Sequence, residues 1–146
     1  MKRFVICITM LFLFSWVSSA QRGLNCFPVF KGKIVPTKRM VVMEASGEKL
    51  ADYQLYYYHS VCFKADGETA QKVARLIQKD AAEAQSAEID NMGNLLTYSL
   101  IQPKPYARAK RYLCYQARPE GHEWVITIIY LEGNATLEDL RYMFEK

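Results

Sequence analysis

The sequence contains none of the short motifs that mark common catalytic and metal sites. It has no Cys-x-x-Cys pair, so nothing points to a zinc ribbon or a thioredoxin-type redox site. It also lacks a glycine-rich phosphate loop and a Gly-x-Ser-x-Gly elbow, which removes the usual grounds for predicting nucleotide binding or an α/β-hydrolase. The carboxylates are scattered, and no two of them indicate divided acid and base roles.

Histidine is scarce, with two residues in the chain. His59 and Cys62 are three residues apart in a segment that resembles a strand, so their side chains should point to opposite faces. They cannot then act as base and nucleophile, which must lie within hydrogen-bond reach. His122 lies in a turn beside Glu120 and Glu123, with no second histidine at a ligand spacing. We therefore predict no catalytic residue, no metal site and no cofactor.

The N-terminus is apolar, but the apolar run is short. Phe4 to Val17 follows a basic start and is shorter than the ~20 residues that a spanning helix needs. Small residues then supply a cleavage site, which predicts a signal peptide over residues 1–20, cut between Ala20 and Gln21. The mature protein would be exported, periplasmic or secreted, with no transmembrane segment. The alternatives are an uncleaved anchor and a lipoprotein modified at Cys26, which sits far past the apolar run.

The charge balance gives no case for nucleic acid as a partner. The chain has 19 basic and 15 acidic residues, a formal net charge of +4. Loss of Lys2 and Arg3 with the leader lowers this to about +2, without the clear basic face that nucleic acid demands. The length of 146 residues allows one domain, which we place at residues 21–146, beginning with an irregular segment over 21–39.

The longest helix-compatible segment is Gly67–Met92. Its apolar residues recur at three- and four-residue steps and form one narrow, alanine-rich stripe: Val73, Ala74, Ile77, Ala81, Ala84 and Ala87. Such a stripe fits closely against a flat surface such as a sheet. Asp66 can cap the first turn of this helix, because its side chain accepts a free backbone N–H.

Most other regular segments show strand patterns. Five are predicted: Met40–Ala45, Tyr53–Lys64, Leu95–Gln102, Lys110–Ala117 and Glu123–Leu131. The connections among the last three are short, which favours antiparallel neighbours, and Glu123–Leu131 is apolar on both faces, as in a central strand. A short helix over Thr136–Glu145 closes the chain, with Thr136 and Asp139 as a capping pair. We predict an α+β fold: a mainly antiparallel sheet of about five strands, one long helix on one face and a short C-terminal helix.

Tyrosine gives the main indication of a binding surface. Alternation places Tyr56, Tyr58 and Tyr112 on the sheet face opposite the helix, where aromatic rings would suit a protein or a surface glycan. The alternative is a sheet core that is solvated only at its phenol tips. A basic loop around Lys104 and Arg111 could instead contact lipid head groups, or be a solvated hairpin tip.

Three cysteines remain once Cys7 leaves with the leader: Cys26, Cys62 and Cys114. An exported chain meets an oxidising compartment, where one disulfide could persist. Cys62 and Cys114 could pair if their strands were neighbours, and Cys26 is a rival partner for either. The third interpretation is three free thiols that serve as small core residues.

The segments GEKLADYQLYYYHSVCF, RYLCY and WVITIIYLEGNATLEDL, together with the cleavage context, resemble small exported Bacteroidota proteins filed as domains of unknown function. That resemblance implies an envelope location and no defined activity. Our leading hypothesis is a non-catalytic envelope module that binds a partner through its tyrosine-rich sheet face. The alternative is a small periplasmic hydrolase-type enzyme whose site is assembled across the fold.

Overall fold

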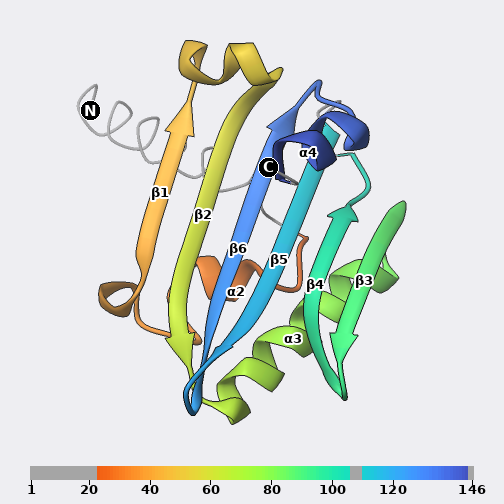
Figure 1. Ribbon diagram of the computed structural model, residues 1–146. Helices are drawn as coiled ribbons and strands as arrows, with labels where there is room; N and C mark the ends of the chain where they lie inside the picture. The colour runs from red at the N-terminus through yellow and green to blue at the C-terminus, as the bar shows by residue number, and fades with distance from the viewer. Residues whose placement is uncertain (1–22, 106–109, 145–146) are drawn as a thin grey trace, which may run out of the picture.

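The computed structural model describes residues 23–105 and 110–144 and consists of one antiparallel sheet with a few helices (Figure 1). The sheet has six strands in the order β1-β2-β6-β5-β4-β3. The strands are β1 (Val41–Ser46), β2 (Leu55–Ala65), β3 (Ser86–Met92), β4 (Leu95–Gln102), β5 (Lys110–Glu120) and β6 (Glu123–Gly133). The helices are α2 (Phe27–Phe30), α3 (Gly67–Ala82) and α4 (Leu137–Phe144), with 3-10 turns η1 (Thr37–Arg39) and η2 (Glu48–Tyr53). The antiparallel α+β fold is confirmed, with one strand more than predicted.

The extra strand comes from the C-terminal part of the predicted long helix. The helix begins as expected, because Asp66 accepts a hydrogen bond from the N–H of Thr69 at 2.7 Å. It ends at Ala82, however, and Ser86–Met92 forms β3, which pairs with β4. Gly93, at φ 62°, is part of the tight turn between these two strands and does not stop a helix. The prediction of one helix over Gly67–Met92 was therefore wrong in its last third.

One face of the sheet packs against α3 and the N-terminal segment. Val73, Ala74 and Ile77 of α3 are buried there, which confirms the predicted stripe over the part that is helical. The alternation predicted for β2 is confirmed from Tyr57 onward, since Val61 and Phe63 belong to the same core and Tyr57 packs against it. Leu55 was predicted on this face but packs in the core on the opposite face, because the register between β2 and β6 shifts between Leu55 and Tyr57. Core residues of the other strands on this side include Leu96, Ile101, Leu113, Tyr115, Ile126, Ile128 and Tyr130.

On the opposite face, α4 covers only one end of the sheet, at the top of β5 and β6 in Figure 1. Leu140 of α4 packs with Leu131 and Tyr112 in a second, smaller core. The predicted capping pair is confirmed, because the N–H of Asp139 donates to Thr136 Oγ1 at 3.1 Å and the N–H of Thr136 donates to Asp139 Oδ2 at 2.9 Å. The C-terminal helix therefore leaves most of this face uncovered.

Strand β6 lies between β2 and β5, as its apolar character on both faces predicted. At its end, Gly133 lies against β2 so closely that an added Cβ would sit 2.6 Å from the Cα of Leu55. Within residues 23–105 and 110–144, no helix is long and apolar enough to cross a membrane. The predicted signal peptide, with its cleavage residues Ala20 and Gln21, lies outside the described residues.

Candidate functional site

The sheet face opposite α3 is covered by a described helix only at one end, where α4 packs (Figure 1). Strand registers align its side chains in two adjacent rows, which together we call the open face. One row is Val41, Cys62, Thr127, Gln116, Tyr98 and Asp90; the other is Met43, Ser60, Ile129, Cys114, Leu100 and Glu88. Val41 and Met43 are 67% and 59% exposed, and Cys62, Thr127 and Ile129 are half-buried. The open face therefore presents a band of small and aliphatic side chains.

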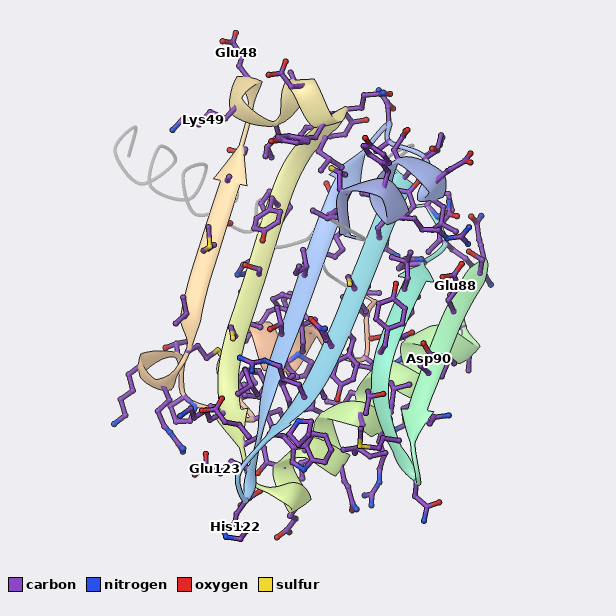
Figure 2. The ribbon with its side chains drawn as sticks, viewed as in Figure 1. Glu48, Lys49, Glu88, Asp90, His122 and Glu123 are labelled. Carbon is purple, nitrogen blue, oxygen red and sulfur yellow. The ribbon has the colours of Figure 1, made fainter. Side chains whose placement is uncertain are left out.

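Charge on the open face differs between its two ends. At the β3 end, Glu88 and Asp90 project from the strand (Figure 2), and Glu88 forms an ion pair with Arg141 of α4. Between β1 and the β5–β6 hairpin, a shallow groove of about 550 Å³ is lined by the basic residues Arg39, Lys64 and Arg118 and by the acidic residues Glu120 and Glu123. The open face is therefore acidic along its β3 edge and carries charges of both signs at the groove.

That groove is lined by apolar as well as charged side chains. Val41, Cys62 and Val125 line it together with Lys64, whose Nζ lies 3.3 Å from Glu120 Oε1. Both members of this ion pair are about half exposed, so the pair contributes little to stability. The groove can contact an acidic or apolar side chain, but it has no buried polar group that would hold a small ligand.

The three tyrosines predicted to form a binding face have different environments. Tyr112 is 1% exposed beneath α4, and its Oη donates to the Ala135 carbonyl oxygen at 2.5 Å. Tyr58 is half-buried against the small core, and Tyr56 is 44% exposed, with its Oη bonded to Asn134 Oδ1 at 3.1 Å. Tyr112 is therefore a core residue, and only Tyr56 offers a largely exposed ring.

The three cysteines are all free. β6 separates β2 from β5, so Cys62 lies opposite Thr127 and Cys114 lies opposite Ile129. A disulfide between Cys62 and Cys114 was predicted only if β2 and β5 were neighbours in the sheet. The two strands are not neighbours. Cys26 is buried in the core on the other side of the sheet. Burial raises the pKa of the Cys114 thiol to about 11.

A polar cluster on the helix side of the sheet was missed by the sequence reasoning. The Oη of Tyr57 donates to Glu44 Oε1 at 2.7 Å, and the Oη of Tyr130 donates to Glu132 Oε1 at 2.5 Å. Burial, followed by the neighbouring carboxylate, raises the pKa of both phenols. Each phenol is thus held protonated as a donor and supplies no nucleophile. The Tyr57–Glu44 pair joins β2 to the edge strand β1, whereas Tyr130 and Glu132 lie on the same strand. The spacing of Tyr130 and Glu132, two residues apart on one strand, is the sequence signal that could have predicted their hydrogen bond.

His59 belongs to the same side of the sheet. Its ring packs on Phe30, with centroids 4.9 Å apart, and its Nδ1 lies 3.5 Å from the Oη of Tyr57. Burial lowers the pKa of His59, which favours the neutral imidazole. Cys62 lies on the opposite face, so the prediction that His59 and Cys62 cannot form a catalytic pair is confirmed.

His122 and Glu123 lie at the exposed tip of the β5–β6 hairpin (Figure 2). In the part of the chain that the structure describes, no group of three or more histidine, cysteine or carboxylate side chains could hold a metal ion.

Residues 13–144 match the model of a family of unknown function, DUF6108. The chain belongs to this family. Neither a curated protein nor a solved structure matches it. Membership of this family of unknown function indicates no activity, so any functional proposal rests on the surfaces of the molecule.

Proposed function

We propose that this DUF6108 protein is an exported, non-catalytic binding module that holds a protein partner on its open face. The observation that carries the proposal is the band of side chains that runs from the exposed Val41 and Met43 on β1 to the half-buried Cys62, Thr127 and Ile129 on β2 and β6. Burying such a band removes apolar area from water, and its inner side chains sit on the central part of the sheet.

Two features favour a protein over a glycan as the occupant. Tyr112 is buried and Tyr98 is half-buried, so the rows of the open face offer small and aliphatic side chains in place of the fully exposed aromatic rings on which sugars stack. The charged ends, acidic at Asp90 and of mixed sign in the groove with Arg39, Arg118 and Glu123, would orient a partner whose charges complement this pattern. Electrostatic complementarity of this kind sets the register of two protein surfaces.

Site-specific photocrosslinking in cells tests the proposal. Gln116 on the open face and Gln78 on α3 are both exposed glutamines, and each is replaced in turn by a photoreactive phenylalanine. We expect a discrete protein adduct from position 116 and none from 78, and we expect Thr127→Arg to abolish the adduct. Identical adducts from both positions, or none from position 116, would contradict the proposal.

Export is the second part of the proposal. It is supported by the basic start, the short apolar run and the small residues up to Ala20, and by the resemblance of the leader to signal peptides of Bacteroidota. The intact mass of the exported protein should correspond to a chain that begins at Gln21. Recovery of the chain with Met1 retained, in a membrane fraction, would rule out cleavage.

A further inference from the structure

The two edge strands of the sheet differ in how well they are protected from pairing with another chain. Strand β3 carries Glu88 and Asp90, and its register with β4 shifts between Asp90 and Asn91. Charged side chains and bulges are the usual devices that keep a sheet edge from adding a further strand. Arg141 of α4 also reaches over to Glu88. The β3 edge is thus protected against pairing with a further strand.

Strand β1, at the other edge, has none of these devices in its first half. Val41, Val42 and Met43 are 67%, 45% and 59% exposed, on both faces of the strand. The register between β1 and β2 runs without a shift from Val41 to Ser46. Among the described residues, β1 pairs only with β2, so its outer row of backbone N–H and C=O groups is available. A regular, apolar edge of this kind is a template for a further strand.

The charges around β1 favour a second copy of the same strand. Lys38 and Arg39 precede β1, whereas Glu44 lies in its second half and is followed by Glu48, Lys49 and Asp52, so the C-terminal end carries three acidic residues and one basic residue. When two copies pair antiparallel about a two-fold axis, the N-terminal end of each lies beside the C-terminal end of the other. The basic residues of each copy then lie beside the acidic residues of the other. A parallel arrangement would oppose like charges.

The apolar residues are equally self-complementary. A two-fold axis normal to the sheet keeps each residue on its own face, so an antiparallel pair of identical strands is centred on one residue. With Val42 at the centre, Val41 lies opposite Met43 of the second copy. Apolar side chains that are strongly exposed in one copy are then covered by the other. Cross-strand apolar contacts of this type stabilise antiparallel pairs.

We propose that the protein forms a two-fold dimer in which the β1 strands of two copies pair antiparallel and join their sheets into one continuous sheet. The proposal concerns an edge of the sheet and does not depend on the function proposed for the open face. It leaves the centre of the open face accessible in both copies, so that the dimer would present two binding surfaces side by side.

Sedimentation equilibrium of the purified exported protein tests this dimer with two matched variants. Val42 and Ile89 are edge-strand residues of nearly equal exposure, 45% and 46%, on β1 and β3 respectively. A lysine on an unpaired edge blocks strand addition, so Val42→Lys should raise the dimer Kd by about tenfold or more. Ile89→Lys should leave the dimer Kd unchanged. A thermal melt of each variant verifies that both remain folded.

A charge exchange supplies the second measurement. Lys38→Glu and Glu44→Lys should each weaken the dimer, and the double variant should recover much of the loss, because opposite charges again lie near each other at the adjoining strand ends. A monomer at every concentration up to about 1 mM would overturn the proposal. A dimer that responds to Ile89→Lys, or to Thr127→Arg but not to Val42→Lys, would also overturn it, since another surface would then form the interface.

Discussion

Asp80 on α3 accepts a hydrogen bond from the backbone N–H of Cys26 at 3.0 Å, although the two residues are 54 positions apart. The N–H of Asn25 donates to the same carboxylate at 2.5 Å. Asp80 is 3% exposed, and Cys26 is fully buried. This one carboxylate therefore ties the N-terminal segment to the last turns of the helix and satisfies backbone donors that no secondary structure would otherwise pair.

The first prediction is that Asp80→Ala destabilises the protein by about 1–3 kcal/mol, because it leaves a buried N–H without an acceptor. Urea denaturation measures the change. Glu83→Ala is the matched control, since Glu83 is exposed and reaches only the side chain of Asn25 at 3.3 Å. A loss of stability that is equal in both variants would show that the backbone bonds to Asp80 contribute nothing.

The second prediction is a pH dependence at the same residue. Burial raises the pKa of Asp80 above its ordinary value, against the opposing effect of its N–H donors. The folded protein thus binds this proton more tightly than the unfolded chain, so the contribution of Asp80 to stability is largest below its unfolded pKa and falls as the pH rises through the folded pKa. The Asp80→Asn variant has no titratable group at this position. The stability of the wild type relative to Asp80→Asn should therefore decrease from pH 4 towards pH 7. A constant difference across this range would contradict the raised pKa.

The third prediction concerns the packing of α3 on the sheet. Ile77 has no exposed surface and lies in the middle of the buried stripe, so Ile77→Ala should cost about 2–5 kcal/mol through lost burial and a cavity. The exposed neighbour Gln78→Ala should change stability by less than about 0.5 kcal/mol. An unchanged denaturation midpoint for Ile77→Ala would mean that this helix face does not pack on the sheet.

The fourth prediction compares two buried tyrosines of β5. The Oη of Tyr115 has no hydrogen-bond partner among the described residues, and neither does Ser99 Oγ on the paired strand, whereas the Oη of Tyr112 donates to Ala135. Tyr115→Phe should therefore stabilise the protein by about 1 kcal/mol, and Tyr112→Phe should destabilise it by about 0.5–1.5 kcal/mol. Thermal melts of both variants measure these changes in stability. A Tyr112→Phe variant that is more stable than the Tyr115→Phe variant would contradict the prediction.

The fifth prediction is a reactivity order for the thiols. Cys62 is half-buried on the open face, whereas Cys114 and Cys26 are buried. Burial also raises the pKa of both buried thiols, with the Asp80 carboxylate adding to the effect at Cys26. Because the thiolate is the reactive form, alkylation of native protein should modify Cys62 first. After denaturation without reductant, all three should react. A disulfide-linked peptide in a non-reducing map would contradict this.

The sequence predicted the meander well, because its pattern is local. Strand β4 was predicted with the observed bounds, and β5 and β6 differ from prediction only in their C-terminal ends. Their alternating or continuously apolar residues distinguish strand from helix. The helix cap at Asp66 and the capping pair Thr136–Asp139 were also predicted from the sequence, because capping depends on residues only three positions apart.

Strand β3 was missed for a physical reason. Ser86–Met92 lies at the sheet edge, where almost every side chain is exposed, so burial imposes no two-residue period on it. Its alanine and glutamate also suit a helix. Ser86–Met92 is a strand because it pairs with β4 across a tight turn at Gly93. That pairing depends on the sequence of β4 and cannot be predicted from Ser86–Met92 alone.

The binding site was predicted less well than the fold. The faces of β2 were assigned correctly from Tyr57 onward, but the accessibility of Tyr112 depends on where α4 docks, and no local pattern fixes that position. The relation between Cys62 and Cys114 likewise depends on strand order, since β6 inserts between their strands. Both outcomes are set by contacts between segments far apart in the chain.

The sheet order also dictates the order in which the protein can assemble. Strands β3 to β6 form a continuous antiparallel run of neighbours, but β2 pairs only with β1 and with β6, the last strand to be synthesised. The β1–β2 hairpin therefore has no sheet to join until the chain is nearly complete, and closing that contact spans α3 and three strands. Long-range closure of this kind slows folding. A chain built in this way cannot complete its sheet until its final strand is present.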